Sequence, residues 1–243
     1  MTQPGARAAG QLPLALRYPP DQRFEGFVAA PSGALAQIEA LASGEAGDWL
    51  YLVGAPGSGK THLALAACAA AESRGRRSAY LPLAAAAGRM REALEALHDN
   101  PFIALDGLDL VAGRREDEVA LFDFHNRARD AGTAVLYAAR ATPDALPLEL
   151  PDLRSRLSQC TRIALSPLDD DGRREVLSLR ARRRGLAIDA AAIDWLLRRV
   201  DRDLSSLAKL LDQLDRASLA EQRRITVPFL RQILGGEAGQ GAQ

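Results

Sequence analysis

The chain has 243 residues, of which 47% are apolar and 26% are charged, so it can bury the core of one or two domains. Lys and Arg together number 31, as do Asp and Glu, and this balance gives no overall indication of a polyanionic partner. The two cysteines show neither metal-binding nor disulfide spacing, which favours a reducing compartment. The sequence also has no signal-peptide core and no apolar stretch of bilayer length. We therefore expect a cytoplasmic protein without membrane contact.

The N-terminal stretch is predicted to be a flexible arm, residues 1–22, because its start is rich in Ala and Gly and its end is stiffened by prolines. Within it, residues 11–16 read Gln-Leu-Pro-Leu-Ala-Leu. Alternate side chains of an extended segment, which Pro13 favours, share one face, and here these are Leu12, Leu14 and Leu16. Such a peptide, with the Gln11 amide at its rim, suits docking on a partner or packing on its own domain.

The next part of the chain, residues 23–166, alternates between strand and helix patterns. Short apolar runs predict buried strands at 49–53, 78–83, 102–105, 134–138 and 160–165. Helical patterns occupy 32–41, 61–73, 88–97 and 116–131. Strands that alternate with helices predict a parallel sheet covered on both faces, and therefore an α/β domain.

No strand pattern remains after Pro167. Helices are predicted at 169–184, 190–200, 204–220 and 227–234. We therefore expect a small all-helical domain at 167–234, followed by a disordered Gly-rich tail at 235–243.

A phosphate-binding motif lies between the first predicted strand and its helix. Residues 54–61 fit the pattern G-x-x-x-x-G-K-[ST] in the strand-to-helix context that the motif requires. Its glycines let backbone N–H groups surround a phosphate at a helix N-terminus, with Lys60 on the terminal phosphates and the Thr61 hydroxyl on Mg²⁺. The predicted nucleotide-binding residues here are Gly54, Ala55, Pro56, Gly57, Ser58, Gly59, Lys60, Thr61 and His62.

An acidic residue, Asp106, ends the third predicted strand at the sheet edge where ligands of open parallel sheets bind. With Thr61 it is our candidate metal ligand, acting through Mg²⁺-bound water; the alternative is an ordinary turn residue. The next position is Gly107, where P-loop hydrolases of this type carry the carboxylate that orients water. Asp109 would need unusual geometry to replace it, so we expect slow ATP hydrolysis or none.

Together these features resemble an AAA+ module: a P-loop parallel sheet core with a small C-terminal all-helical lid. The details resemble the DnaA-related family, and more closely its Hda branch, the regulatory inactivators of DnaA. The stretches that carry the likeness are 11–16, 108–113 with 120–126 (ALFDFHN), 150–157 (LPDLRSRL), and 179–182 with 211–218 in the lid. The resemblance covers roughly residues 11–234. Because only residues 235–243 follow it, we expect no DNA-binding domain of the kind that DnaA carries.

The resemblance also implies roles for particular residues. Residues 11–16 look like the sliding-clamp-binding peptide of Hda, so Gln11, Leu12, Leu14 and Leu16 become its candidate contacts. Residues 150–157 look like the arginine-finger box, which makes Arg156 the candidate finger in trans. Arg154 is the other candidate, and an ordinary surface arginine is the alternative. Phe27, with Phe24, would form the adenine-side wall or else belong to the core.

Two further positions depart from the family. Arg140 follows the fourth strand, where a small polar or acidic residue is usual, and Ser205 replaces a nucleotide-facing Arg of the lid. The loss of that Arg–phosphate contact puts nucleotide affinity in question.

What the resemblance implies is a negative regulator of replication initiation. Bound to ADP or ATP with Mg²⁺, it would dock on the DNA-loaded sliding clamp and stimulate hydrolysis of the ATP that DnaA holds. A homo-oligomer stays open, as does direct DNA contact through the basic run at 180–184. The rivals are an AAA+ ATPase with its own turnover, such as a helicase loader, and a nucleotide-free clamp or DnaA adaptor.

Overall fold

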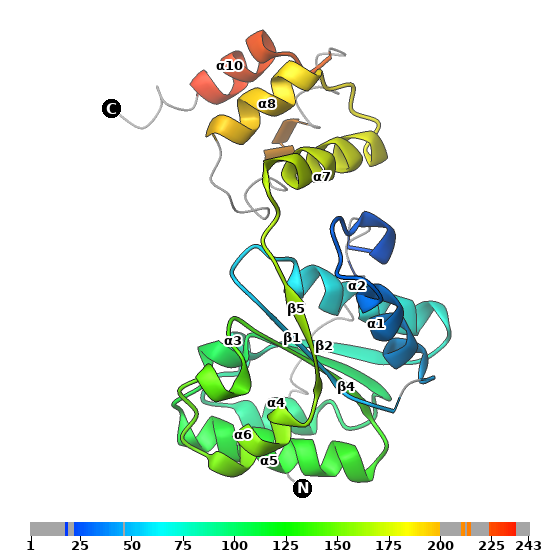
Figure 1. The fold of residues 1–243 in the computed structure, drawn as a ribbon, viewed down its shortest axis with the longest axis vertical. Helices are drawn as coiled ribbons and strands as arrows, with labels where there is room; N and C mark the ends of the chain where they lie inside the picture. Colours follow the sequence, from blue (N-terminus) through cyan, green and yellow to red (C-terminus); the bar gives the residue numbers. More distant parts are fainter. Residues whose placement is uncertain are drawn as a thin grey trace, which may run out of the picture.

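The computed structural model describes residues 18, 22–45, 47–199, 210–211, 213–214 and 224–236. The predicted clamp peptide at 11–16 and the lid position Ser205 lie outside these residues. Five parallel strands form one sheet, in the order β2-β3-β4-β1-β5 (Figure 1). Their bounds are Leu50–Gly54 for β1, Ser78–Pro82 for β2, Phe102–Asp106 for β3, Ala134–Ala139 for β4 and Thr161–Leu165 for β5.

Helices cover both faces of this sheet (Figure 1). One face packs against α1 (Ala34–Ser43) and the alanine-rich α2 (Lys60–Ser73). The other face packs against α3 (Leu83–Ala86), α4 (Met90–Glu95), α5 (Arg115–Asp130) and α6 (Pro151–Ser158). Short 3₁₀ turns are η1 (Phe24–Gly26), η2 (Leu108–Leu110) and η3 (Pro143–Ala145).

The central strands are apolar throughout because both of their faces are covered. In β4 all six residues are buried, and its neighbours β1 and β3 pair with it in register, for example Tyr51 opposite Tyr137 and Leu105 opposite Tyr137. Alternate residues of each strand therefore pack into two separate cores, since successive side chains point to opposite faces of the sheet. Leu52 joins the α1–α2 core and Tyr51 the α4–α6 core.

The helical segment follows β5, and residues 166–169 connect the end of this strand to α7 (Asp170–Arg183) (Figure 1). Asp169 starts this helix, because its carboxylate accepts a 2.7 Å hydrogen bond from the Gly172 N–H. The segment also contains α8 (Ala190–Arg199) and α10 (Val227–Gly236), and it has an apolar core of its own. Ile188 and Ile225 form an isolated parallel bridge at its side.

The predicted fold class is confirmed: a parallel sheet with helices on both faces, followed by a helical unit. The predicted end of the last helix is wrong, because α10 continues through Gly236, two residues into the segment assigned to the tail. Most of the predicted helix at 204–220 lies outside the described residues, although 210–211 and 213–214 are helical. Among the described residues, no helix combines the length and apolarity that a membrane span requires.

Candidate functional site

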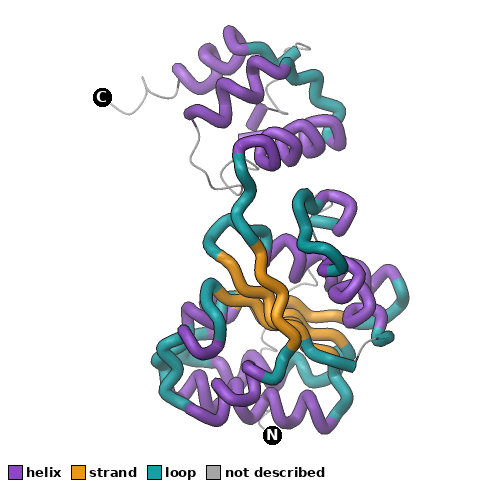
Figure 2. The backbone as a smooth tube through the Cα atoms, viewed as in Figure 1, coloured by secondary structure: helices purple, strands orange, loops and turns teal. Residues whose placement is uncertain are grey.

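The phosphate loop occupies the turn between β1 and α2, at the carboxyl edge of the sheet (Figure 2). Gly57 and Gly59 have φ values of 78° and 93°, a left-handed conformation that glycine adopts without steric cost. Gly54 is needed for a different reason: a Cβ there would lie 2.4 Å from the Leu165 carbonyl oxygen and 2.6 Å from Ser58 Oγ. The loop is thus folded tightly against the end of β5.

The Lys60 ammonium lies across this loop. Its Nζ donates to the carbonyl oxygens of Gly54 at 2.7 Å and Ala55 at 2.9 Å. Burial lowers the pKa of Lys60 and Arg140 lowers it further, whereas Asp106 and Asp109 raise it. The amine is therefore positioned at the loop, and these three charged groups lie close enough to act on it.

Thr61 and Asp106 meet at the start of α2. The Thr61 hydroxyl donates a 2.6 Å hydrogen bond to Asp106 Oδ2, and the Tyr80 hydroxyl donates to the same oxygen at 3.0 Å. A hydroxyl and a carboxylate are oxygen ligands of the kind Mg²⁺ accepts, and that ion usually takes only one or two protein groups beside water and phosphate. The pair therefore fits the ion, with no larger His/Cys/Asp/Glu cluster found in the described part of the chain.

The Phe27 ring packs against the phosphate loop at Gly59. A Cβ on Gly59 would come within 2.4 Å of the Phe27 ring, and the ring also meets His62 edge-on, with centroids 5.4 Å apart. His62 Nε2 is bonded to the Arg23 carbonyl oxygen at 2.9 Å. The structure thus brings Phe27 and His62 together beside the loop. It also packs Phe27 partly against the α1–α2 core, so the adenine wall stays a prediction.

The turn after β3 differs from that of a working hydrolase. Gly107 has a φ of 89°, which disfavours any side chain there. The chain then turns into η2, and Asp109 reaches the end of β4. Its Oδ1 accepts the Arg140 backbone N–H at 2.9 Å and its Oδ2 lies 3.2 Å from Arg140 Nε. Asp109 is the nearest candidate to replace the water-orienting carboxylate that Gly107 lacks. Its carboxylate is already bonded to Arg140.

The sequence and the structure were both found to be similar to known proteins. Residues 170–234 match the sequence family described as "Hda, lid domain". Domain III of the replication initiation protein DnaA from Thermotoga maritima is similar in structure, with a TM-score of 0.71, 20% identity, and coverage of 89% of this chain and 97% of that one. The lid segment of this chain thus resembles that of Hda, and the chain as a whole has the fold of a DnaA AAA+ domain.

Two further solved structures have the same fold. A replication initiator DnaA bound to AMPPCP and single-stranded DNA gives a TM-score of 0.65 at 20% identity, over 85% of this chain and 70% of that one. The Holliday junction branch migration motor RuvB from Thermotoga maritima gives 0.62 at 15% identity, over 88% and 71%. The AAA+ core and helical lid expected from the sequence are therefore confirmed.

The two candidate arginine fingers, Arg154 and Arg156, differ in their surroundings. Both lie on α6, but Arg154 turns inward and donates to the Leu148 carbonyl oxygen. Arg156 is half-buried, and no described residue forms a hydrogen bond or ion pair with its guanidinium. This difference favours Arg156 over Arg154 as the residue available to a partner, and the role itself stays a prediction.

Two residues, Tyr80 and Glu118, and one ion pair, Asp109–Arg140, were not predicted from the sequence. Tyr80 gives no motif signal, because only the pairing of β2 with β3 brings it to Asp106. Arg140 was noted as a departure, but its pairing with Asp109 depends on the turn at Gly107. Glu118 looks like an ordinary first-turn acid of α5, yet it is fully buried and accepts from the N–H groups before α6.

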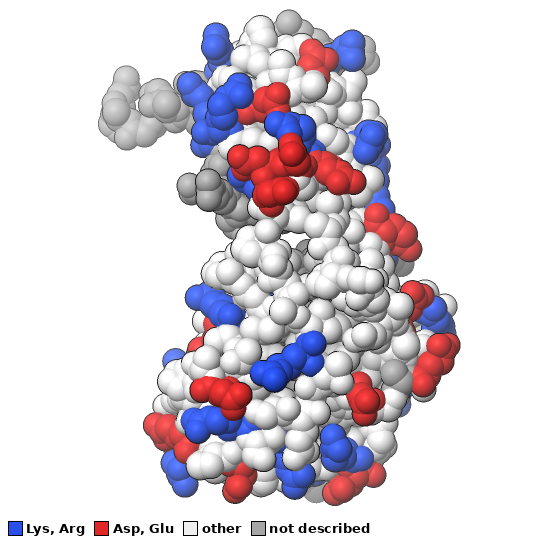
Figure 3. Space-filling view, viewed as in Figure 1, with Lys and Arg blue, Asp and Glu red and all other residues white. Residues whose placement is uncertain are grey.

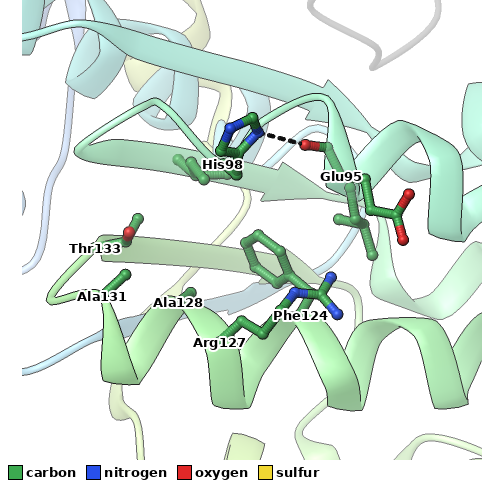
Figure 4. A pocket seen from close by; sticks show the side chains of 9 residues that line it. Glu95, His98, Phe124, Arg127, Ala128, Ala131 and Thr133 are labelled. Atoms are coloured by element: carbon green, nitrogen blue, oxygen red, sulfur yellow. Dashed lines mark hydrogen bonds between the residues drawn. The ribbon is translucent and has the colours of Figure 1, made fainter.

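A separate hollow lies at the opposite edge of the sheet, between α4, α5 and β3 (Figure 4). It has a volume of about 560 Å³, and its labelled wall includes His98, Phe124 and Arg127. None of the predicted nucleotide, finger or metal residues lines it. The space-filling view shows acidic and basic groups interspersed over the visible face of the α/β body (Figure 3), so this face carries no single-sign patch for a polyanion.

Proposed function

We propose that this Hda/DnaA-related protein is a negative regulator of replication initiation that acts on the nucleotide of its partner. ADP or ATP with Mg²⁺ would occupy the phosphate loop and hold the α/β core and lid in a binding-competent form. The arm at 11–16 would dock on the DNA-loaded sliding clamp. Arg156 would then stabilise the charge that develops on ATP held by DnaA, so that DnaA-ATP becomes DnaA-ADP.

One contrast carries the proposal. In the described turn after β3 no carboxylate is free to orient water, because Gly107 cannot supply one and Asp109 is held by Arg140. It nevertheless carries Arg156 on α6, within the finger-like box, and no residue that the structure describes pairs with its guanidinium. Loss of the hydrolytic group together with an available Arg156 suits a protein that activates another chain. Own turnover should stay below about one per second, the low end of ordinary enzymes.

The nucleotide part is supported by the fit of Lys60, Thr61 and Asp106 to phosphate and Mg²⁺, and by relatives of the same fold, one of which is a DnaA bound to AMPPCP. Lys60 would hold the terminal phosphates, and Thr61 with Asp106 would hold the ion and its water. The bound Mg²⁺ would neutralise phosphate charge. The partner assignment rests on the Hda lid match.

The test is reconstitution of the full chain with DNA-loaded clamp and DnaA-ATP, in which conversion to DnaA-ADP is followed. Arg156→Ala should keep DnaA binding but lower stimulation by about a thousandfold, as fingers do in GTPase systems. Arg162→Ala, an exposed arginine on β5, is the matched control and should stimulate normally. Full stimulation by Arg156→Ala would contradict the finger.

Two further arms separate the rival functions. Gln11→Ala with Leu14→Ala should abolish clamp pull-down without altering the unfolding temperature. Rapid steady-state ATP turnover by the isolated chain would instead indicate an ATPase such as a helicase loader. Failure to bind ADP at millimolar concentration with Mg²⁺ would indicate a nucleotide-free adaptor.

A further inference from the structure

The hollow between α4, α5 and β3 is an apolar recess at the amino edge of the sheet, beside the first residues of β3 (Figure 4). Its volume of about 560 Å³ is within the range of ligand sites. Buried apolar side chains form its wall, among them Leu94, Ile103 and Phe124. Three exposed polar or charged side chains also line it: Glu95, His98 and Arg127. The recess therefore fits an apolar partner that carries a polar group at its edge.

The described start of the chain runs toward this same edge. The Arg23 carbonyl oxygen lies 2.9 Å from Nε2 of His62, a residue in the first turn of α2, so Arg23 is at the carboxyl edge. Tyr18 is at the amino edge, because its hydroxyl lies 3.0 Å from Oγ of Ser78, the first residue of β2. The residues that precede Tyr18 are therefore tethered at the edge that contains the hollow.

The hollow is one strand away from this tether. Ser78 pairs with Phe102 in the register of β2 with β3, and the next residue, Ile103, lines the hollow. Neighbouring strands lie about 4.8 Å apart, and β2 is the end strand of the described sheet. An extended chain spans roughly 3.3 Å per residue, so Leu12 has a reach of roughly 20 Å from Tyr18. The leucines of the arm can therefore pass round β2 and enter the hollow.

We propose that the leucine face of the chain's own arm, Leu12, Leu14 and Leu16, docks in this hollow. Alternate side chains of an extended segment share one face, and here they supply the apolar surface that the hollow lacks. The Gln11 amide both donates and accepts hydrogen bonds, which suits the mixed polar rim. Because the same leucines are proposed to bind the sliding clamp, the hollow and the clamp compete for them; this consequence rests on the proposed function.

Disulfide trapping on the full chain tests the docking without any partner. Leu14→Cys is combined with Ala131→Cys, at an exposed position that lines the hollow. The matched control combines Leu14→Cys with Ser73→Cys, at an exposed position on α2. Ser73 follows Glu72, whose Oε1 lies 3.4 Å from Ser78 Oγ, so an undocked arm reaches it from Tyr18 at least as readily.

The intramolecular disulfide to position 131 should form about tenfold faster than the one to position 73, because a disulfide needs Cα atoms within about 7 Å and docking holds the arm there. The natural cysteines, Cys68 and Cys160, are buried and should not compete. Mass spectrometry of the oxidised protein identifies each product. Equal rates for the two pairs, or disulfide-linked dimers in place of the intramolecular product, overturn the inference.

The effect on the clamp is measured separately. Ala131→Glu places a carboxylate in the hollow and should release the arm, so the DNA-loaded clamp should bind about tenfold more tightly, as expected when roughly nine-tenths of the arms are docked. Ser73→Glu adds the same charge outside the hollow and should bind like wild type. Wild-type clamp affinity in Ala131→Glu overturns the inference. If the wild-type chain binds no clamp, the proposed function fails, and the disulfide rates alone decide whether the arm docks.

Discussion

Polar and ionisable side chains are held in two different ways within one α/β body. At the phosphate-loop edge, Lys60, Thr61 and Asp106 bond to one another or to loop carbonyls, and solvent reaches them. Beneath the sheet, in the layer of α5, Glu118 and His125 are completely buried. The first group can exchange its partners for a ligand, whereas the second cannot lose a partner without leaving a buried polar group unsatisfied.

Glu118 is the sharpest case in the buried layer. Its carboxylate accepts backbone N–H groups of Gly113 at 2.7 Å, Glu149 at 3.2 Å and Leu150 at 2.7 Å. It thereby joins the loop that follows η2 to the start of α6, the helix that carries Arg156. One side chain thus links the segment behind the phosphate site to the candidate finger.

The largest predicted effect follows from this position. Glu118→Ala removes a buried acceptor from three part-buried backbone N–H donors, so the free energy of unfolding should fall by about 4 kcal/mol. Glu118→Gln keeps the shape and one acceptor oxygen, and should lose about half as much. Urea unfolding measures both. The exposed Glu116, in the same turn of α5, is the control, and a similar loss in Glu116→Ala would contradict the distinction between the two regions.

His125 should make the same layer sensitive to acid. Its Nδ1 bonds to the Tyr137 hydroxyl at 3.1 Å, and the Trp49 ring packs against it. Burial lowers the pKa of His125 to about 4, and the charges of Arg129 and Arg156 add to this shift. The unfolded chain therefore binds the proton first as pH falls, since an unperturbed histidine titrates near 6.5.

The expected result is a stability contribution that is present above about pH 6.5 and lost as pH falls toward 4, amounting to about 3 kcal/mol. In His125→Phe the imidazole is absent, so the free energy of unfolding should depend less on pH across this window. Urea unfolding at a series of pH values checks this against His98→Gln, which alters an exposed histidine and should retain the wild-type slope. Equal slopes in all three proteins would rule out the role of His125.

The same contrast explains what the sequence could predict. The phosphate loop is a local pattern of eight residues, and apolar runs such as 102–105 indicate buried strands, so both were found without a structure. Glu118 could not be recognised, because an acidic residue in the first turn of a helix is usually solvated. Only the tertiary approach of residues 149–150 makes it a buried acceptor. Asp109 likewise depends on the left-handed backbone at Gly107, which no motif encodes.

The smallest effect is predicted at the phosphate-loop edge. Tyr80→Phe removes the 3.0 Å hydrogen bond to Asp106 Oδ2, and it is comparable with the Glu118 substitutions because each deletes a bond to a carboxylate. Asp106 keeps its bond to Thr61 and is open to water, so the free energy of unfolding should fall by about 1 kcal/mol or less. Tyr18→Phe, which deletes a tyrosine bond to Ser78 away from Asp106, is the matched comparison. If Tyr80→Phe lost as much stability as Glu118→Gln, Asp106 would be as rigidly held as the buried carboxylate, and it would then be poorly suited to exchange Thr61 and Tyr80 for a hydrated cation.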